Sequence, residues 1–214
     1  MIISHRHKFI FFAVPKTGTH AVRQALRAQL GEEDQEQVGL FVQKRFPFPE
    51  LAEVPHGHIN ARQIAPVLGE SVFGSYFKFA FVRNPYDRFV SYCAFRGRDG
   101  AFAANPTALM RFIAGNPRSR EQILFRPQSE FLVDEAGKLA IDFAGRTENM
   151  QTDYDAICAR IGIPTTTLGQ VNASPHGPFM KYYDRELRRW VGDFYRRDFE
   201  MFDYERDELA AQSA

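Results

Sequence analysis

The sequence predicts an α/β protein built on an open parallel sheet with helices on its faces. Two segments carry this prediction, Phe9–Val14 and Phe77–Val82. Each is a continuous apolar run of strand length, which is typical of a strand buried on both faces. Each leads through a short loop containing proline into a helix-forming segment. Two strand–loop–helix units, each followed by a long connection, indicate parallel strands.

The helices that follow these strands have clear local signals. After the first strand, Pro15 and Gly18 interrupt the apolar run, and good helix formers extend from about residue 21 to residue 30. After the second strand, Pro85 stands at a first helical position, where its missing N–H costs nothing. The helix that it begins is expected to reach about Arg96 and to bury one apolar face.

The remaining elements are predicted with weaker signals. We expect a short helix over 61–68 and a hairpin in which 131–133 and 139–143 flank a turn. A helix capped by Asn149 should end at Gly162, and a long C-terminal helix should begin near Asp184.

Length and composition bound the function. Residues 1–208 are predicted to form a single domain, with 209–214 as a frayed tail. The 27 basic and 26 acidic residues leave a net charge of +1, so no basic field exists to hold nucleic acid. The longest apolar runs are far shorter than the roughly 20 residues of a membrane span, and the N-terminus lacks a signal peptide. Cys93 and Cys158 are expected to be buried free thiols. A cytoplasmic protein is therefore expected.

The first loop has the character of a phosphate site. A loop between a buried strand and a helix N-terminus presents unpaired N–H groups to an anion. Here Lys16 adds charge, Thr17 and Thr19 add hydroxyls, and Gly18 allows close approach of the backbone. The nucleotide-binding pattern G-x-x-x-x-G-K-[ST] is absent, which disfavours an ordinary kinase or NTPase. A simple Pro-Gly turn with a solvated lysine is the structural alternative.

The second loop could hold a phosphate monoester. Arg83 leaves the end of an apolar strand, in the crevice where open α/β sheets bind ligands. Arg88 and Ser91 are three residues apart and share a helix face. Arginine forks and hydroxyls suit phosphate. The structural alternative is that Arg83 pairs with Asp87 and that Ser91 is an ordinary helical residue.

Together, the two loops resemble the sulfotransferases that use 3′-phosphoadenosine 5′-phosphosulfate (PAPS). The segment Pro15-Lys16-Thr17-Gly18-Thr19 resembles the family's 5′-phosphosulfate loop, and 83–92 resembles its 3′-phosphate motif R-x-P-x-x-R-x-x-S-x-Y. The segment 143–149 resembles the family's late strand-to-helix segment, and 171–174 and 182–204 resemble the C-terminal part of its carbohydrate branch. The resemblance implies a P-loop-like sheet, PAPS as sulfuryl donor and no metal.

The resemblance also assigns roles to residues. Residues 16–19 would hold the 5′-phosphosulfate, and Arg83 and Ser91 the 3′-phosphate. His20 and Ala21 complete the cofactor-binding set, although His20 replaces a usual hydroxyl and Ala21 a frequent serine or tryptophan. His20 could still donate to a phosphate oxygen. These departures leave a non-catalytic nucleotide-binding module open as an alternative.

A candidate general base lies in the segment His56-Gly57-His58. Neutral histidine can accept the proton of an acceptor hydroxyl. The segment resembles that of uronyl 2-O-sulfotransferases, which implies His58 as base and His56 as a substrate contact or helper. Lys16 would compensate the charge on the departing oxygen. Glu53 is a second candidate base, a plain polar loop is the structural alternative, and a zinc site lacks partner ligands.

These features predict a PAPS-dependent sulfotransferase that acts on a hydroxyl, most simply of a carbohydrate. A kinase or NTPase on a related fold is the main rival. It predicts binding of ATP with Mg²⁺ and gives Arg83 and Ser91 no role.

Overall fold

A computed structural model describes residues 1–37, 48–52, 54–169 and 178–206. The chain divides into two compact units. The first, which we call the sheet unit, comprises Met1–Val82 and Gln128–Asn172. The second, the helical unit, comprises Arg83–Pro127 and Ala173–Ala214.

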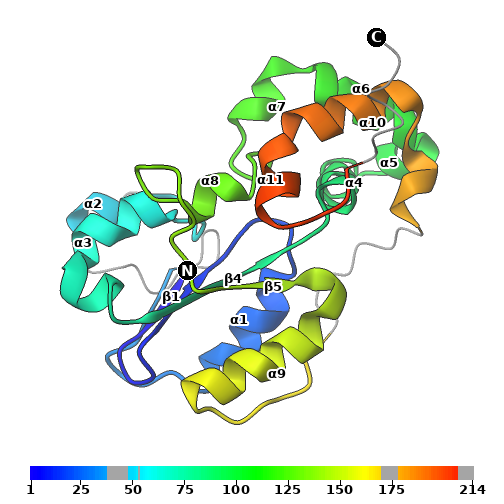
Figure 1. The fold of residues 1–214 in the computed structure, drawn as a ribbon. Coiled ribbons are helices and arrows are strands. Elements are labelled where there is room, and N and C mark those ends of the chain that lie inside the picture. The colour runs from blue at the N-terminus through cyan, green and yellow to red at the C-terminus, as the bar shows by residue number, and fades with distance from the viewer. Residues whose placement is uncertain (38–47, 53, 170–177, 207–214) are drawn as a thin grey trace. The chain divides into compact units, whose positions relative to one another are not determined.

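The sheet unit is built on a mixed sheet with the order β3-β1-β2-β4-β5 (Figure 1). Its described strands are β1 (Ile2–Ser4), β2 (Phe9–Phe12), β3 (Gln35–Glu36), β4 (Phe77–Val82) and β5 (Phe143–Arg146). Strands β2, β4 and β5 are parallel to one another, whereas β1 runs antiparallel to both β2 and β3. The α/β class and the parallel core are confirmed. The antiparallel edge was not predicted, because two- and three-residue strands carry no readable periodicity.

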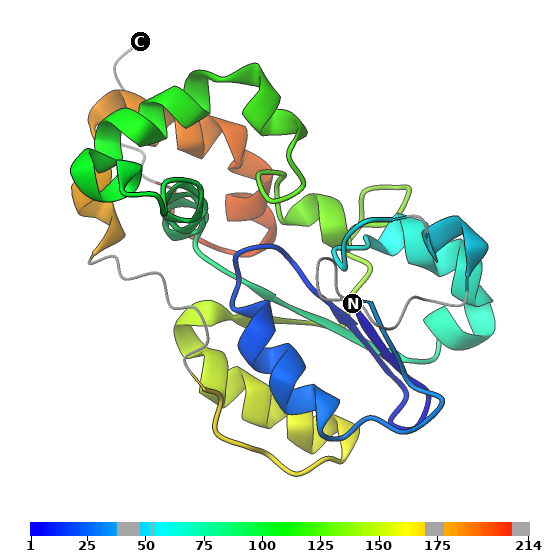
Figure 2. The same ribbon diagram turned by 180° about the vertical axis from the view of Figure 1, so that it is seen from behind.

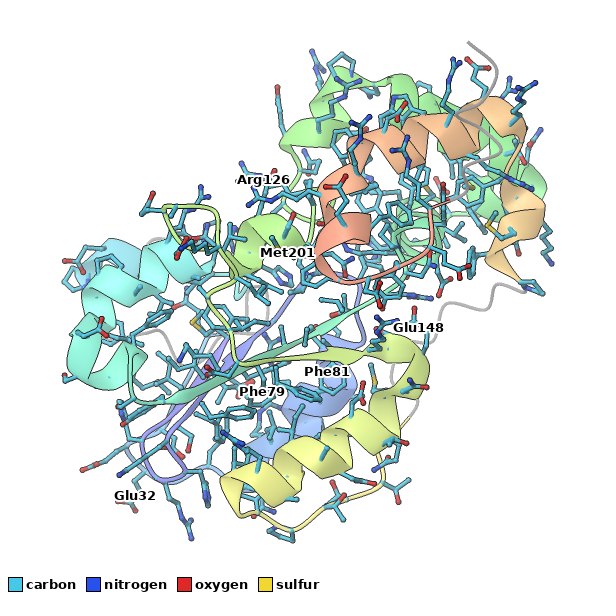
Figure 3. All side chains as sticks on the ribbon, viewed as in Figure 1. Glu32, Phe79, Phe81, Arg126, Glu148 and Met201 are labelled. Atoms are coloured by element: carbon cyan, nitrogen blue, oxygen red, sulfur yellow. The ribbon has the colours of Figure 1, made fainter. Side chains whose placement is uncertain are left out.

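Helices cover both faces of this sheet. They are α1 (Thr19–Arg27), α2 (Pro49–Ala52), α3 (Ala61–Phe73), α8 (Ser129–Leu132) and α9 (Met150–Ile161), with a 3₁₀ turn η1 at Thr147–Asn149. Helices α1 and α9 lie on one side of the sheet and α3 on the other (Figures 1 and 2). Phe79 and Phe81 of β4 face α1 and α9 (Figure 3), where they pack with Val22, Leu26 and Ile157.

The helical unit packs around α4 (Pro85–Arg96). Its other helices are α5 (Ala101–Ala104), α6 (Pro106–Gly115), α7 (Pro117–Glu121), α10 (Arg185–Phe194) and α11 (Arg196–Met201), with a 3₁₀ turn η2 at Phe179–Tyr182. Phe89 of α4 contacts the rings of Phe125 and Trp190 in the core. The predicted C-terminal helix begins after its Asp184 cap as expected, but it is broken at Tyr195 into two helices.

Three further predictions meet corrections in the sheet unit. Helix α3 is longer than expected and is kinked at Gly69, where φ is 68°. The predicted hairpin is reduced to a single bridge between Val133 and Leu139, because the preceding residues form α8. Asn149 precedes α9 but makes no side-chain capping bond, whereas Gly162 ends that helix as predicted.

The two cysteines are buried and free, as predicted. In the described ranges, none of the helices combines the length and the apolar character that crossing a membrane requires.

Candidate functional site

The loop between β2 and α1 has an unusual backbone. Lys16 has φ of 66° and Gly18 has φ of 73°, so both lie in the left-handed region that L side chains rarely adopt. Gly18 is the N-cap of α1, and no side chain caps this helix. The first N–H groups of α1 therefore lack the side-chain acceptor that caps α3, α4, α6, α7 and α10. Such a helix start is suited to an anion.

Some hydrogen-bond donors of this loop are already used within the fold. The Thr17 hydroxyl is fully buried and donates to the carbonyl oxygen of Val14 at 3.0 Å. Thr17 thus holds the loop together, and its hydroxyl hydrogen is committed. The Ala21 N–H donates to the Gly18 carbonyl at 3.1 Å, so this main-chain donor is also used. His20 is exposed at the same helix start.

Gly18 is fixed by packing as well as by its backbone angle. A Cβ atom at this position would lie 2.3 Å from the terminal methyl of Met150. The sheet unit thus brings the start of α9 directly against the loop. Any larger residue at position 18 would have to displace that side chain and accept a strained φ.

The His56–His58 segment lies at the end of β2, beside the same loop. The Nδ1 atom of His58 is 2.6 Å from the carbonyl oxygen of Ala13. Because a carbonyl only accepts, Nδ1 carries the proton and Nε2 has the lone pair. Burial lowers the pKa of His58 to about 3, and the nearby charge of Arg23 acts in the same direction, against the Ala13 hydrogen bond. His58 is therefore neutral and has the form of a base.

The segment is held by contacts from distant parts of the chain. The Gln37 side-chain amide donates to the carbonyl oxygens of Val54 and His56 at 3.1 and 3.4 Å. The Met1 amino group donates to the Gly57 carbonyl at 2.6 Å. The rings of His56 and His58 lie 5.9 Å apart. Glu53, the other candidate base, lies outside the described residues.

In the helical unit, Arg83 makes the pairing that the structural alternative predicted. Its Nε donates to the Asp87 carboxylate at 2.7 Å, and its side chain is 16% exposed. The ion pair holds the guanidinium against the first turn of α4. Ser91 is 3% exposed on the same helix. Arg83 directly follows Val82, the last residue of β4.

Arg88 is buried in the interior of the helical unit, where it hydrogen-bonds the main chain. It is 2% exposed, and its Nη2 donates to the carbonyl oxygens of Leu124 and Arg126 at 3.3 and 2.8 Å. Its guanidinium also lies over the ring of Tyr195, 5.8 Å from the centroid. Arg88 therefore braces the chain between α7 and α8, and the phosphate role considered for it from the sequence is not supported by these contacts.

One charged residue beside the loop was not singled out from the sequence. Arg23 lies on α1 between the core residues Val22 and Leu26 and is only 4% exposed. An arginine on the apolar face of an amphipathic helix is a signal that the sequence already contained. Within the described ranges, no group of three or more His, Cys, Asp or Glu side chains is placed to hold a metal.

The sheet unit thus joins an uncapped helix start, a lysine and a neutral histidine at the end of one buried strand. Comparison with known families gives this arrangement a context. The model of the Sulfotransferase family matches residues 1–205, which is nearly the whole chain. No curated protein matched the chain, and no solved structure did. The mixed sheet flanked by helices is consistent with the fold of that family. The chain therefore belongs to the sulfotransferase family, whose members transfer sulfuryl groups.

Proposed function

We propose that this protein transfers a sulfuryl group from PAPS to a hydroxyl of a carbohydrate, with His58 as the general base. The observation that carries the proposal is the hydrogen bond of 2.6 Å from His58 to Ala13. It fixes the tautomer of a neutral histidine at the end of the strand that leads into the phosphate-type loop. A base needs this combination of position and protonation state.

The loop residues fit a donor that carries phosphate at both ends. When bound, PAPS supplies the sulfuryl group and a 5′-phosphate as leaving group. The uncapped start of α1 and the charge of Lys16 suit the 5′-phosphosulfate, which would accept from N–H groups at this helix start. Arg83 and Ser91 would hold the 3′-phosphate, as the motif implies.

His58 would take the proton of the acceptor hydroxyl on Nε2. The donation from Nδ1 to Ala13 keeps the ring in place and stabilises the imidazolium as it forms. A pKa of about 3 describes a weak base in the unliganded protein. A polyanion at the neighbouring loop would raise that pKa toward the working range, because negative charge favours the protonated ring. Lys16 would balance the charge on the departing oxygen.

The proposal that the acceptor is a carbohydrate depends on the His56-Gly57-His58 segment, which resembles that of uronyl 2-O-sulfotransferases. In this reading His56, whose ring lies 5.9 Å from that of His58, contacts the substrate or assists the base. The segment is anchored by the Gln37 amide, so it is a fixed part of the sheet unit. A fixed base is expected of an enzyme that must align one hydroxyl among several.

The proposal is tested by calorimetric titration with adenosine 3′,5′-bisphosphate, with 5′-AMP and with ATP–Mg²⁺. We expect the bisphosphate to bind most tightly, because it alone occupies both phosphate sites. A preference for ATP–Mg²⁺, or no binding of any of the three, would contradict the proposal. Tight binding of the bisphosphate without sulfuryl transfer to any of a panel of glycans would instead favour a nucleotide-binding module.

A further inference from the structure

Arg23 is a buried cation with two side-chain nitrogens that lack a hydrogen-bond partner among the described residues. Its side chain is 5% exposed, and it pairs with the carboxylate of Glu36 on β3, with Nε 3.3 Å from Oε1. Burial lowers the pKa of Arg23 to about 10, which reflects the cost of keeping this charge away from water.

Glu36 is already satisfied by another residue. Arg27, one helical turn further along α1, donates from Nε to Oε2 at 2.7 Å and from Nη2 to Oε1 at 2.8 Å. This is a bidentate pair with good geometry. By contrast, Nε and Nη2 of Arg23 are shielded from solvent and have no hydrogen-bond partner within the described residues. Buried donors on a charged group are normally bonded, so this arrangement requires an explanation.

The position of Arg23 on α1 places it near the loop between β2 and α1. It follows Thr19 by four residues and His20 by three, and helical side chains slant toward the N-terminus of their helix. Partial loss of solvent around the ring lowers the pKa of His20, and the charge of Arg23 lowers it further, ahead of that of Lys16. The charge of Arg23 also lowers the pKa of His58. Arg23 therefore lies near both the start of α1 and the candidate base.

We propose that Arg23 binds the sulfuryl group of the donor, by exchanging its 3.3 Å contact with Glu36 for the sulfuryl oxygens. This inference rests on the proposed function. Arg23 and Arg27 share the carboxylate of Glu36, so an anion would offset the second positive charge. A planar guanidinium presents parallel donors that match such oxygens. Arg27 keeps Glu36 paired after Arg23 moves.

The test compares two ligands that differ only in the sulfuryl group. Dissociation constants for PAPS and for adenosine 3′,5′-bisphosphate are measured by calorimetry without acceptor. We expect the unaltered protein to prefer PAPS. Arg23→Gln should reduce that preference by about 10- to 100-fold, the scale for losing a charge-assisted contact. It should change the affinity for the bisphosphate by less than about threefold.

Two further variants keep the test decisive. Arg160→Gln is the control, because Arg160 is an exposed arginine of α9 whose guanidinium lies over the ring of Phe77. It should leave the ratio of the two affinities unchanged. Arg23→Lys retains the buried charge without the fork and should lower the ratio by only a few fold, so it serves even where Arg23→Gln fails to fold.

Separate outcomes identify which idea fails. If the unaltered protein binds the bisphosphate but Arg23→Gln and Arg23→Lys leave the preference for PAPS intact, only the inference about Arg23 is overturned. Equal losses for both ligands would overturn it too, since Arg23 would then act on the loop as a whole. If the unaltered protein binds neither nucleotide, the proposed function fails and Arg23 loses its assigned ligand.

Discussion

Helices α1 and α4 follow neighbouring parallel strands, yet they begin in opposite ways. Helix α1 starts behind Gly18 with φ of 73° and no capping side chain. Helix α4 starts behind Asn84, whose side chain accepts from the Tyr86 N–H at 3.0 Å, with Pro85 at a first position that needs no partner. The first helix leaves its first N–H groups without a side-chain acceptor, whereas the second closes its own start directly after Arg83.

The start of α1 costs the folded protein more free energy than the capped start of α4. A missing cap costs about 0.5–2 kcal/mol, and a left-handed residue such as Lys16 costs roughly another 1–2 kcal/mol. Both costs fall on one short loop beside His58. Strain that the fold tolerates at one place is typical of a functional site. Helix α4 shows that the same chain can also close a helix start with an ordinary side-chain cap.

The largest expected effect is on chemistry beside the α1 loop. His58→Ala should lower turnover about 10²- to 10⁴-fold, since a general base contributes on that scale. Binding of adenosine 3′,5′-bisphosphate should change little, because the role proposed for His58 is at the acceptor hydroxyl. Steady-state kinetics with calorimetry check both points. His7→Ala, whose ring contacts the Gln29 carbonyl away from the loop, is the control. Near-normal turnover for His58→Ala would move the base to Glu53.

The next largest effect is expected on the binding of the 3′-phosphate, which we assign to Arg83 before α4 and not to the α1 loop. Arg83→Ala should weaken the binding of adenosine 3′,5′-bisphosphate by about 2–4 kcal/mol, the scale for losing a buried charge-assisted contact. It should leave 5′-AMP unaffected, because that nucleotide lacks the 3′-phosphate. Asp87→Asn keeps Arg83 but removes its 2.7 Å partner, so a smaller loss is expected. Equal losses for the two nucleotides would end the assignment of Arg83 to the 3′-phosphate.

Acid should destabilise the fold through His58. Its pKa is about 3 in the folded protein, below the ordinary value of 6.5. The unfolded chain therefore binds more protons between these values, and stability falls as the pH drops below about 6.5. The loss should approach ~1.4 kcal/mol per pH unit from this group. Denaturant unfolding between pH 7 and pH 4.5 measures it, and an equal slope in His58→Gln would refute the attribution.

Gly18→Ala tests whether the α1 loop needs glycine for space as well as for its backbone angle. The new methyl group would meet Met150 at 2.3 Å and force a left-handed alanine. We expect about 1–3 kcal/mol of destabilisation. Gly162→Ala is the matched control, since φ there is 72° but no atom lies within 4 Å. Thermal unfolding of both variants separates the two costs, and equal losses would show that Met150 yields freely.

The smallest expected effect is at the cap of α4. Asn84→Ala should cost about 1 kcal/mol of stability, the usual value of an N-cap. Asn60→Ala, which removes the capping box of α3, should cost a similar amount. Because the cap is internal, binding of 5′-AMP should be unchanged within error. A large loss of nucleotide affinity in Asn84→Ala would mean that α4 also binds through its first turn.

Local signals were sufficient for the central elements of the fold. The bounds of β4 and α4 match the predicted 77–82 and 85–96, because an unbroken apolar run and a proline at a first helical position act over a few residues. Strands β1 and β3 could not be predicted in this way. Their pairing is long-range, and each is too short to show alternation.

The candidate site was only partly readable for the same reason. Lys16 and Gly18 were singled out from the loop's own sequence, whereas their left-handed backbone angles were not predicted. The contact between His58 and Ala13 joins residues 45 positions apart, and the bond from Arg88 to Arg126 joins residues 38 apart. Such contacts depend on how the elements pack. They decide which histidine nitrogen is basic and which arginine is internal.

The most direct test of the contrast between the two helix starts is an NMR titration with 5′-AMP. This nucleotide carries only the 5′-phosphate. We predict large shifts for the amide resonances of Gly18, Thr19 and His20, since phosphate would accept from these N–H groups, and small shifts for Tyr86 and Asp87. Large shifts at Tyr86 and Asp87 with none in the α1 loop would contradict the account.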